Sequence, residues 1–349
     1  MRMRAPGLPF LPALLACAVL AACDAGDDGA PDAAGDVLPG DVLPGDDATP
    51  EARGGGGTFP EGATEAQILA LEEVNRHRIA SGLAPVDEDE ALNRAAQAHA
   101  SFIVSNCANY GRTGLSPHEE DASWPGFTGE DLGDRATAAG FKPDGFGGGL
   151  GEVIAFHDAP ARAVPGWIRT LYHRLPLLDP QTRRIGYGGD TSGALCLLSQ
   201  YSNADVIDTF LAPWQDDAVV LYPPDGGRRI PTSFDGLESP EPVRPPKAQP
   251  WPSGTIITVQ FGHPLAFSVT GHRLLRAGTT DVPHLVVASV GDEAAGVVRD
   301  PNLDDPRTLA LYAHDRLAAG TDYTVVLDLV RNGAPLHLEW SFKTDYKQD

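Results

Sequence analysis

The side chains best suited to chemistry are imidazoles and carboxylates in four short stretches of the middle of the chain. The stretches are Ser116-Pro117-His118-Glu119-Glu120, Gly151-Glu152-Val153, Trp167-Ile168-Arg169-Thr170-Leu171-Tyr172-His173-Arg174 and Ile185-Gly186-Tyr187-Gly188. Imidazole can ligate a metal or act as a general base near neutral pH, and carboxylate can assist in either role. Neither Gly-x-Ser-x-Gly nor His-Glu-x-x-His occurs, so no nucleophile or metalloprotease motif accompanies these residues.

The order of these stretches resembles the CAP superfamily, the cysteine-rich secretory, antigen 5 and pathogenesis-related (SCP-like) proteins. It is similar to the bacterial form, in which a His-Arg pair follows a Trp by six residues, as His173-Arg174 follows Trp167. CAP proteins also open with an Asn-x-x-Arg helix and a Gly-Leu-x-Pro turn, which Asn75 to Arg78 and Gly82 to Pro85 match.

The resemblance implies a shallow cleft that gathers histidines and glutamates from distant parts of the chain. His118 corresponds to the first histidine of the family, Glu152 to its glutamate after glycine, and His173 to its second histidine. Thr170 stands where eukaryotic members have a second glutamate, which leaves one acid fewer. The expected cleft lining is His118, Glu119, Glu152, Trp167, Thr170, His173 and Arg174.

Three roles are compatible with such a set. His118, His173 and Glu152 could hold zinc with an open fourth position for hydrolysis. Without metal, Glu152 could orient one imidazole while the other acts as general base. The three could also satisfy one another and hold the sheet against the helix that carries Trp167, the role favoured by the missing nucleophile motif. They remain catalytic candidates without an assigned step.

Three further features have two interpretations each. Glu119 and Glu120 could supply a further oxygen ligand, but adjacent acids on a loop favour a solvated face. Arg174 either pairs with a carboxylate in the cleft or fixes the loop before Leu177. His99 lies on the apolar face of a helix, which favours a hydrogen-bonded core histidine over a metal ligand.

The elements that must position these residues begin with two helices. Thr64 to Gln67 has the form of a capping box, and the helix that it opens should end at Ser81-Gly82. A second helix is predicted over 89–105. Strands are predicted over 150–156, 184–187 and 194–201, with a hairpin loop at 188–193, and a helix over about 158–171 should kink or split at Pro165.

This order predicts an α+β fold, which the family's three-layer α-β-α sandwich accommodates, for a CAP domain over residues 63–213. A second domain over 214–345 should be an all-β, immunoglobulin-like (Ig-like) sandwich with a turn at Asn332-Gly333. Its seven predicted strands are 218–222, 255–261, 272–276, 284–290, 308–314, 323–330 and 336–343. Its five histidines have no ligand spacing and are expected to be ordinary strand residues: His263, His272, His284, His314 and His337.

The first 62 residues predict export and a membrane anchor. Residues 1–22 have two early arginines and a short apolar run, typical of a signal peptide, and end in Leu20-Ala21-Ala22 before Cys23, which looks like a bacterial lipobox. The alternative is ordinary cleavage that leaves Cys23 a free thiol. Residues 23–62 are acidic, with Gly35 to Pro39 repeated at once, and predict a disordered tether.

The net charge and the expected localisation limit the classes of partner that this protein can bind. A net charge of -22 repels nucleic acid. We therefore expect a monomeric lipoprotein of the cell envelope, anchored to a bacterial membrane, that binds an extracellular lipid or surface partner without catalysis. The alternative is a metal-dependent, protease-like hydrolase that uses His118, Glu152 and His173.

The cysteines give the first testable prediction. Cys17 leaves with the leader and Cys23 is the lipidation site, so Cys107 and Cys196 remain to form a disulfide in an oxidising compartment. Mass analysis of the mature protein should show that both thiols resist alkylation until a reductant is added. Labelling of either cysteine without reductant would contradict the pairing.

Overall fold

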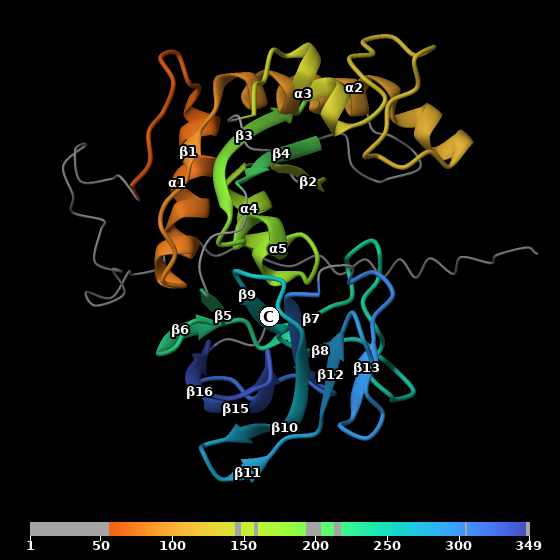
Figure 1. The fold of residues 1–349 in the computed structure, drawn as a ribbon. Helices are drawn as coiled ribbons and strands as arrows, with labels where there is room; N and C mark the ends of the chain where they lie inside the picture. Colours follow the sequence, from red (N-terminus) through yellow and green to blue (C-terminus); the bar gives the residue numbers. More distant parts are fainter. Residues whose placement is uncertain are drawn as a thin grey trace, which may run out of the picture. The chain divides into compact units, whose positions relative to one another are not determined.

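The computed structural model describes residues 56–143, 148–156, 160–192, 204–212, 218–303 and 306–346 (Figure 1). The leader, Cys23, most of the tether, the predicted strand at 194–201 and Cys196 lie outside the described residues. Ala48–Asp349 forms one compact unit. Within the described part, no helix combines the length and apolar character that crossing a membrane requires.

Helix α1 (Glu65–Ala80) begins as its sequence predicts. The Thr64 hydroxyl accepts from the Gln67 amide, and the Gln67 side chain accepts from the Thr64 amide, so the capping box is confirmed. The helix ends at Ser81, and Gly82 follows with a φ of 76°. Leu71 and Val74 are buried on its inner face.

Helix α2 (Glu90–Thr113) is two turns longer than predicted. It begins at its cap Asp89, whose carboxylate accepts from the amides of Ala91 and Leu92. Beyond the expected end, the buried side chains of Asn106 and Tyr110 continue the inner face, and this packing keeps the chain helical as far as Gly114.

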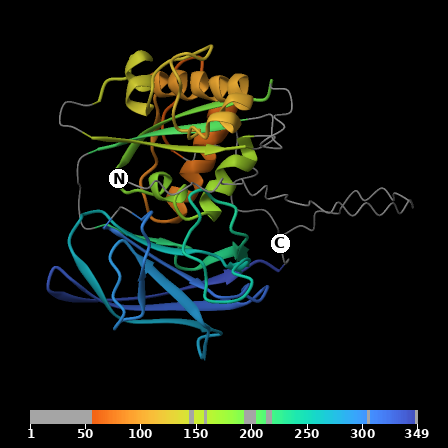
Figure 2. The ribbon, with the colours of Figure 1, turned by 90° about the vertical axis from the view of Figure 1, so that its right-hand side faces the viewer.

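One four-stranded sheet lies among the helices, in the order β1 (Asp87–Glu88), β3 (Thr182–Asp190), β4 (Ala204–Leu211), β2 (Gly149–Ala155). β4 runs antiparallel to both β3 and β2. Strand β4 was missed in the sequence because two aspartates interrupt its apolar pattern. Figures 1 and 2 show α2 and α3 (Leu132–Ala138) along one face of this sheet, with α1, α4 (Pro160–Arg169) and α5 (Arg174–Leu177) toward the other.

The expected split at Pro165 does not occur. Pro165 lies inside α4, which remains one helix from Pro160 to Arg169. Ala163, Val164 and Trp167 are buried in the core that α4 shares with α1 and the sheet, so packing offsets the missing backbone donor.

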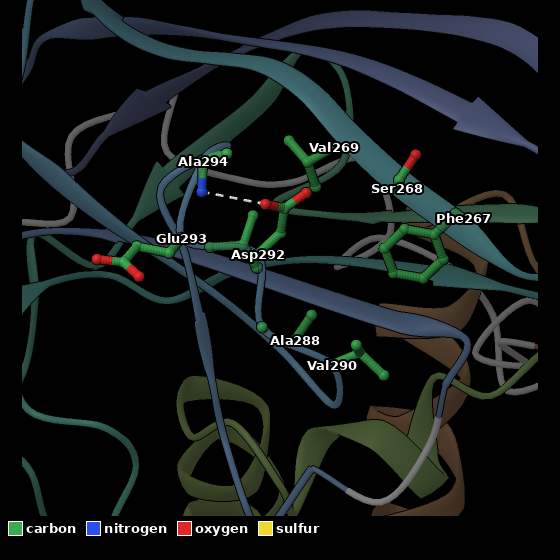
Figure 3. A pocket seen from close by; sticks show the side chains of 10 residues that line it. Phe267, Ser268, Val269, Ala288, Val290, Asp292, Glu293 and Ala294 are labelled. Carbon is green, nitrogen blue, oxygen red and sulfur yellow. Dashed lines mark hydrogen bonds between the residues drawn. The ribbon is translucent and has the colours of Figure 1, made fainter.

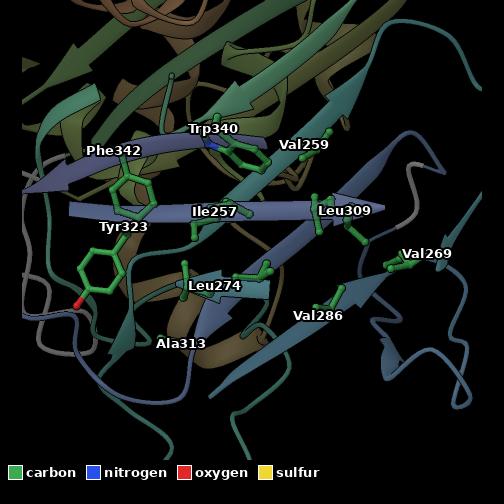
Figure 4. Packing of buried hydrophobic residues seen from close by; sticks show 14 of the residues in the cluster. Ile257, Val259, Val269, Leu274, Val286, Leu309, Ala313, Tyr323, Trp340 and Phe342 are labelled. Carbon is green, nitrogen blue, oxygen red and sulfur yellow. The ribbon is translucent and has the colours of Figure 1, made fainter. Parts of the chain in front are cut away.

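The remaining strands form two five-stranded sheets with a common core (Figure 4). One has the order β11 (Thr280–Asp281), β10 (Phe267–Arg276), β15 (Asp322–Arg331), β16 (Ala334–Thr344), β6 (Gly227–Ile230). The other has the order β13 (Val297–Arg299), β12 (His284–Ala288), β14 (Thr308–Ala313), β9 (Ile257–Phe261), β5 (Val219–Tyr222). Two short strands, β7 (Ser233–Phe234) and β8 (Ser253–Gly254), pair with each other in a separate two-stranded sheet.

All seven strands predicted for this region are present, some longer than expected. The predicted turn between β15 and β16 is confirmed, because Asn332 and Gly333 both have a positive φ there. Leu274 and Trp340 of one sheet share the core with Val259 and Leu309 of the other.

Two glycines of β3 set the contact between the sheet and α2. A Cβ added at Gly186 would lie 2.1 Å from the carbonyl carbon of Leu92, and one at Gly188 would lie 2.1 Å from the backbone nitrogen of Gln97. The helix backbone therefore packs directly on the strand, which explains the Gly-x-Gly in the fourth sequence stretch.

Replacing Gly186 by alanine should destabilise the protein by about 3 kcal/mol or more, because the clash involves backbone atoms that cannot move aside. Chemical denaturation of the full mature chain would measure the loss. Gly149→Ala on β2 is the matched control, since nothing lies within 4 Å of its added Cβ. Equal stability of the two variants would contradict this account of the packing.

Candidate functional site

The structure brings His118 and Glu152 together. Glu152 lies on β2, and its Oε1 is 2.8 Å from Nδ1 of His118 in the loop after α2. Its other oxygen, Oε2, accepts from Arg135 of α3 at 2.6 Å, and Arg135 also donates to the His118 carbonyl. The His118 side chain is 46% exposed whereas the Glu152 side chain is 4% exposed, so His118 is the solvent edge of this group.

A second imidazole lies behind the first. His99 of α2 is fully buried and its Nδ1 is 2.8 Å from Glu120 Oε1, while its Nε2 is 2.9 Å from the Pro117 carbonyl. The prediction of a hydrogen-bonded core histidine is therefore confirmed. Both partners are acceptors, so both ring nitrogens must donate and His99 carries a positive charge.

The expectation of a solvated face is wrong for Glu120. This side chain is buried and accepts from the Thr128 amide at 2.7 Å and from the Thr128 hydroxyl, in addition to His99. The loop after α2 folds back over the helix and carries Glu120 inward, whereas its neighbour Glu119 stays exposed. These contacts lower the pKa of Glu120 although burial alone would raise it.

A third carboxyl, which the sequence analysis missed, lies beside Glu152. Asp208 of β4 is paired with Glu152 in the strand register and is fully buried, and among the described residues neither of its oxygens has a hydrogen-bond partner within ordinary distance. Burial raises the pKa of Asp208 well above its ordinary value, and the charge of Glu152 raises it further. Burial and the neighbouring charge therefore both disfavour the ionised form of Asp208.

Glu152 itself stays ionised. Burial would raise the pKa of Glu152, but the bond from His118 and the charges of His99 and Arg135 outweigh burial and lower it. The charges consequently balance. Two cations, His99 and Arg135, face two carboxylates, Glu120 and Glu152. No sequence motif marks Arg135 or Asp208, because their roles depend on the approach of α3 and β4 to β2.

His173 has a different partner. Its Nδ1 is 2.8 Å from Oε1 of Glu238, in the loop between β7 and β8. The Glu238 carboxylate also accepts from the amides of Leu171 and Tyr172 at 2.7 Å and of His173 at 3.1 Å. An acid from far along the chain therefore holds the turn between α4 and α5, and nothing near Glu238 in the sequence signals this contact.

The remaining expected cleft residues near His173 are mostly interior. Trp167 is 2% exposed, and the Thr170 hydroxyl donates to the Trp167 carbonyl. Arg174 is buried, donates to the carbonyls of Ile168 and Ile256, and stacks on the Tyr222 ring at 3.7 Å. Of the two roles considered for Arg174, the structure shows neither as stated: within the described residues Arg174 bonds to backbone carbonyls of α4 and of the segment just before β9, and not to a carboxylate.

His118, Glu152 and His173 are therefore not arranged as the zinc site that was one of the three roles considered for them. Among the residues that the structure describes, no three His, Cys, Asp or Glu side chains are placed to hold a metal ion together. The physical reason is that each imidazole has its own carboxylate, and Arg135 occupies the second oxygen of Glu152. These residues as arranged do not fit zinc.

Comparison with known proteins supports the assignment of this part of the chain. Residues 71–200 match the family model named CAP, the cysteine-rich secretory protein family. The matched segment includes His99, His118, Arg135, Glu152 and His173 but not Glu238.

A solved structure also shows similarity. An outer surface protein from Borrelia burgdorferi is 17% identical, with a TM-score of 0.27, over 41% of this chain and 90% of that protein. No curated protein matches the chain.

Arg135→Met should destabilise the full chain by about 3–5 kcal/mol at neutral pH, because it leaves the ionised Glu152 buried without its cation. The matched control is Arg273→Met, which breaks the exposed pair with Asp281 and should cost less than about 1 kcal/mol. Chemical denaturation measures both. Similar losses in the two variants would contradict a special role for the buried pair.

The same variant should alter the dependence of stability on pH. Folding lowers the pKa of Glu152. The contribution of Glu152 to stability is therefore complete above the pKa that it has in the unfolded chain, and it is lost as the pH falls through the lower pKa of the folded state. Removing Arg135 brings the two values closer, so the acid-side loss should shrink. If the loss of stability at low pH is the same in the variant as in the wild type, other carboxylates cause it.

Proposed function

We propose that this protein is a secreted, lipid-anchored CAP-domain protein of a bacterial cell envelope that binds an extracellular lipid or surface partner without catalysis. In this proposal Cys23 carries the lipid, residues 23–62 form the tether, and the mature protein is a monomer. Residues 63–213 form the three-layer α-β-α CAP sandwich that presents the binding surface, and residues 214–345 form an immunoglobulin-like sandwich. The CAP match over residues 71–200 supports the first of these two domains.

The observation that carries the proposal is the hydrogen-bonded network around Glu152. Each Glu152 oxygen and each His99 nitrogen has a partner. Neither of these two groups therefore has a free position for a substrate proton, and a network of this kind favours a rigid surface. His118 is the exposed member and would meet the ligand.

The loop that carries His118 also supplies apolar surface. Phe127 is 38% exposed on this loop. Trp124 packs against Phe102 at 6.0 Å and edge-on against Tyr110 at 5.0 Å, which fixes the loop on α2. An exposed imidazole and an exposed aromatic ring on the same loop suit an amphipathic ligand with a polar head, such as a membrane lipid.

Binding can be tested with the unlipidated mature chain and vesicles of phosphatidylcholine, with and without phosphatidylglycerol. We expect co-sedimentation with one of the two compositions, and a loss of about tenfold in affinity in a His118→Ala, Phe127→Ala double variant that removes a polar contact and an apolar one. His337→Ala, which alters an exposed histidine of β16, is the control and should bind like the wild type.

Metal analysis of the same preparations tests the alternative. Absence of vesicle binding, together with stoichiometric zinc that is lost in a His118→Ala, His173→Ala variant, would overturn the proposal in favour of a metal-dependent hydrolase. Equal vesicle binding by the wild type and the His118→Ala, Phe127→Ala variant would show that the binding surface lies elsewhere on the protein.

A further inference from the structure

Two histidines from opposite sheets of the β-rich part contact each other. His272 lies on β10 and His284 on β12, and Nδ1 of His272 is 2.8 Å from Nε2 of His284. The ring centroids are 4.9 Å apart and the planes meet at 81°. Both lie on strands, as the sequence predicts, but the contact between their rings was not expected from the sequence.

The outer nitrogens of the pair both face backbone carbonyls. His284 Nδ1 is 2.7 Å from the Val282 carbonyl, and His272 Nε2 is 3.1 Å from the Ala295 carbonyl. A carbonyl only accepts, so each of these contacts needs a hydrogen on the ring, and the contact between the rings needs one more. Three hydrogens are required, whereas two neutral imidazoles supply only two.

The fully bonded pair therefore holds one extra proton and one positive charge. Burial lowers the pKa of His284, and repulsion from His272 and His314 lowers it further, which favours His284 as the acceptor in the contact between the rings. In that arrangement His272 donates from both nitrogens. If that proton leaves, one of the three contacts must break.

The Ala295 carbonyl belongs to a tight turn. Asp292 and Val297 exchange backbone hydrogen bonds across the turn, and Oδ1 of Asp292 accepts from the Ala294 amide (Figure 3). Gly296 has a φ of 70°, and a Cβ there would lie 3.3 Å from Nε2 of His272, so the turn rests closely on that ring.

The turn is also one wall of a cavity of about 670 Å³. The opposite wall is lined by Phe267, Ser268 and Val269 of β10. These residues come three to five positions before His272 on the same strand. The bond from His272 to Ala295 thus joins the two walls.

We propose that His272 and His284 form a one-proton latch that fixes the Asp292–Gly296 turn against β10 when the pair is protonated and releases it when the pair is neutral. Acidification closes the latch and a rise in pH opens it. The cavity wall formed by this turn is consequently held more firmly in acidic surroundings.

Other ionisable groups lie near the pair, on the neighbouring strands and on the turn. In the part of the chain that the structure describes, none of them is hydrogen-bonded to either ring: Asp281, Asp292, Glu293, His314 and Asp328. Asp281 is paired with Arg273, and Asp328 is paired with His337.

Amide hydrogen exchange in the full mature chain tests the latch. Protection factors of residues 292–297 should fall about fivefold between pH 5.5 and pH 8, the effect expected for one neutral hydrogen bond. In His272→Gln the side-chain amide can still donate to Ala295 but does not titrate, so protection should not change with pH. The control His337→Gln should behave like the wild type.

Nitrogen NMR of the histidine rings gives a second measurement on the same samples. At pH 5.5 we expect His272 to be charged and His284 to be neutral with its hydrogen on Nδ1. Two neutral rings at that pH, or a pH-dependent loss of protection that persists in His272→Gln, would overturn the proposal. Protection that does not vary with pH in the wild type would do the same.

Discussion

The buried ion pair between Glu152 and Arg135 is the interaction on which the arrangement of the CAP-like part depends. It joins β2 to α3, and through the His118 carbonyl it also fixes the loop that follows α2. An ionised carboxylate with a side chain only 4% exposed is costly unless cations and donors surround it. His118, His99 and Arg135 meet that condition, and each comes from a different segment of the chain.

The second constraint is steric. The helix that carries His99 can approach the sheet only because β3 has no side chain at Gly186 and Gly188. That approach places His99 3.8 Å from Glu152, close enough for its charge to lower the pKa of the carboxyl. The glycines of the sequence motif therefore act on the electrostatics of the site through packing, although they contact none of its polar atoms.

Two unrelated histidine sites each need one more ring hydrogen than neutral imidazoles supply. His99 faces a carboxylate and a carbonyl, and His272 faces an imidazole and a carbonyl. His99 must donate from both nitrogens, because both of its partners only accept. In the His272–His284 pair one of the two rings must do so, because three contacts need three hydrogens. The His99 ring is bonded to the buried carboxylate of Glu120, whereas the partners of the His272–His284 pair are backbone carbonyls.

Local sequence determined the elements whose signals are local. The capping box at Thr64, the cap at Asp89, the turn at Asn332-Gly333 and the seven strands of the β-rich part could all be read from neighbouring residues. The motif order also indicated the CAP match and the closeness of His118 to Glu152. These features depend on short-range hydrogen bonds, backbone preferences and pattern, which a linear sequence contains.

Only the tertiary structure decided the partners of the buried charged groups. Arg135, Asp208 and Glu238 carry no motif, and their roles follow from which strand or loop packs beside Glu152 or His173. The resemblance placed His118 and His173 in one set, but a carboxylate distant in sequence bonds to His173. A buried charge takes whichever complementary group the fold brings within a few ångströms, and that distance does not exist until the chain has folded.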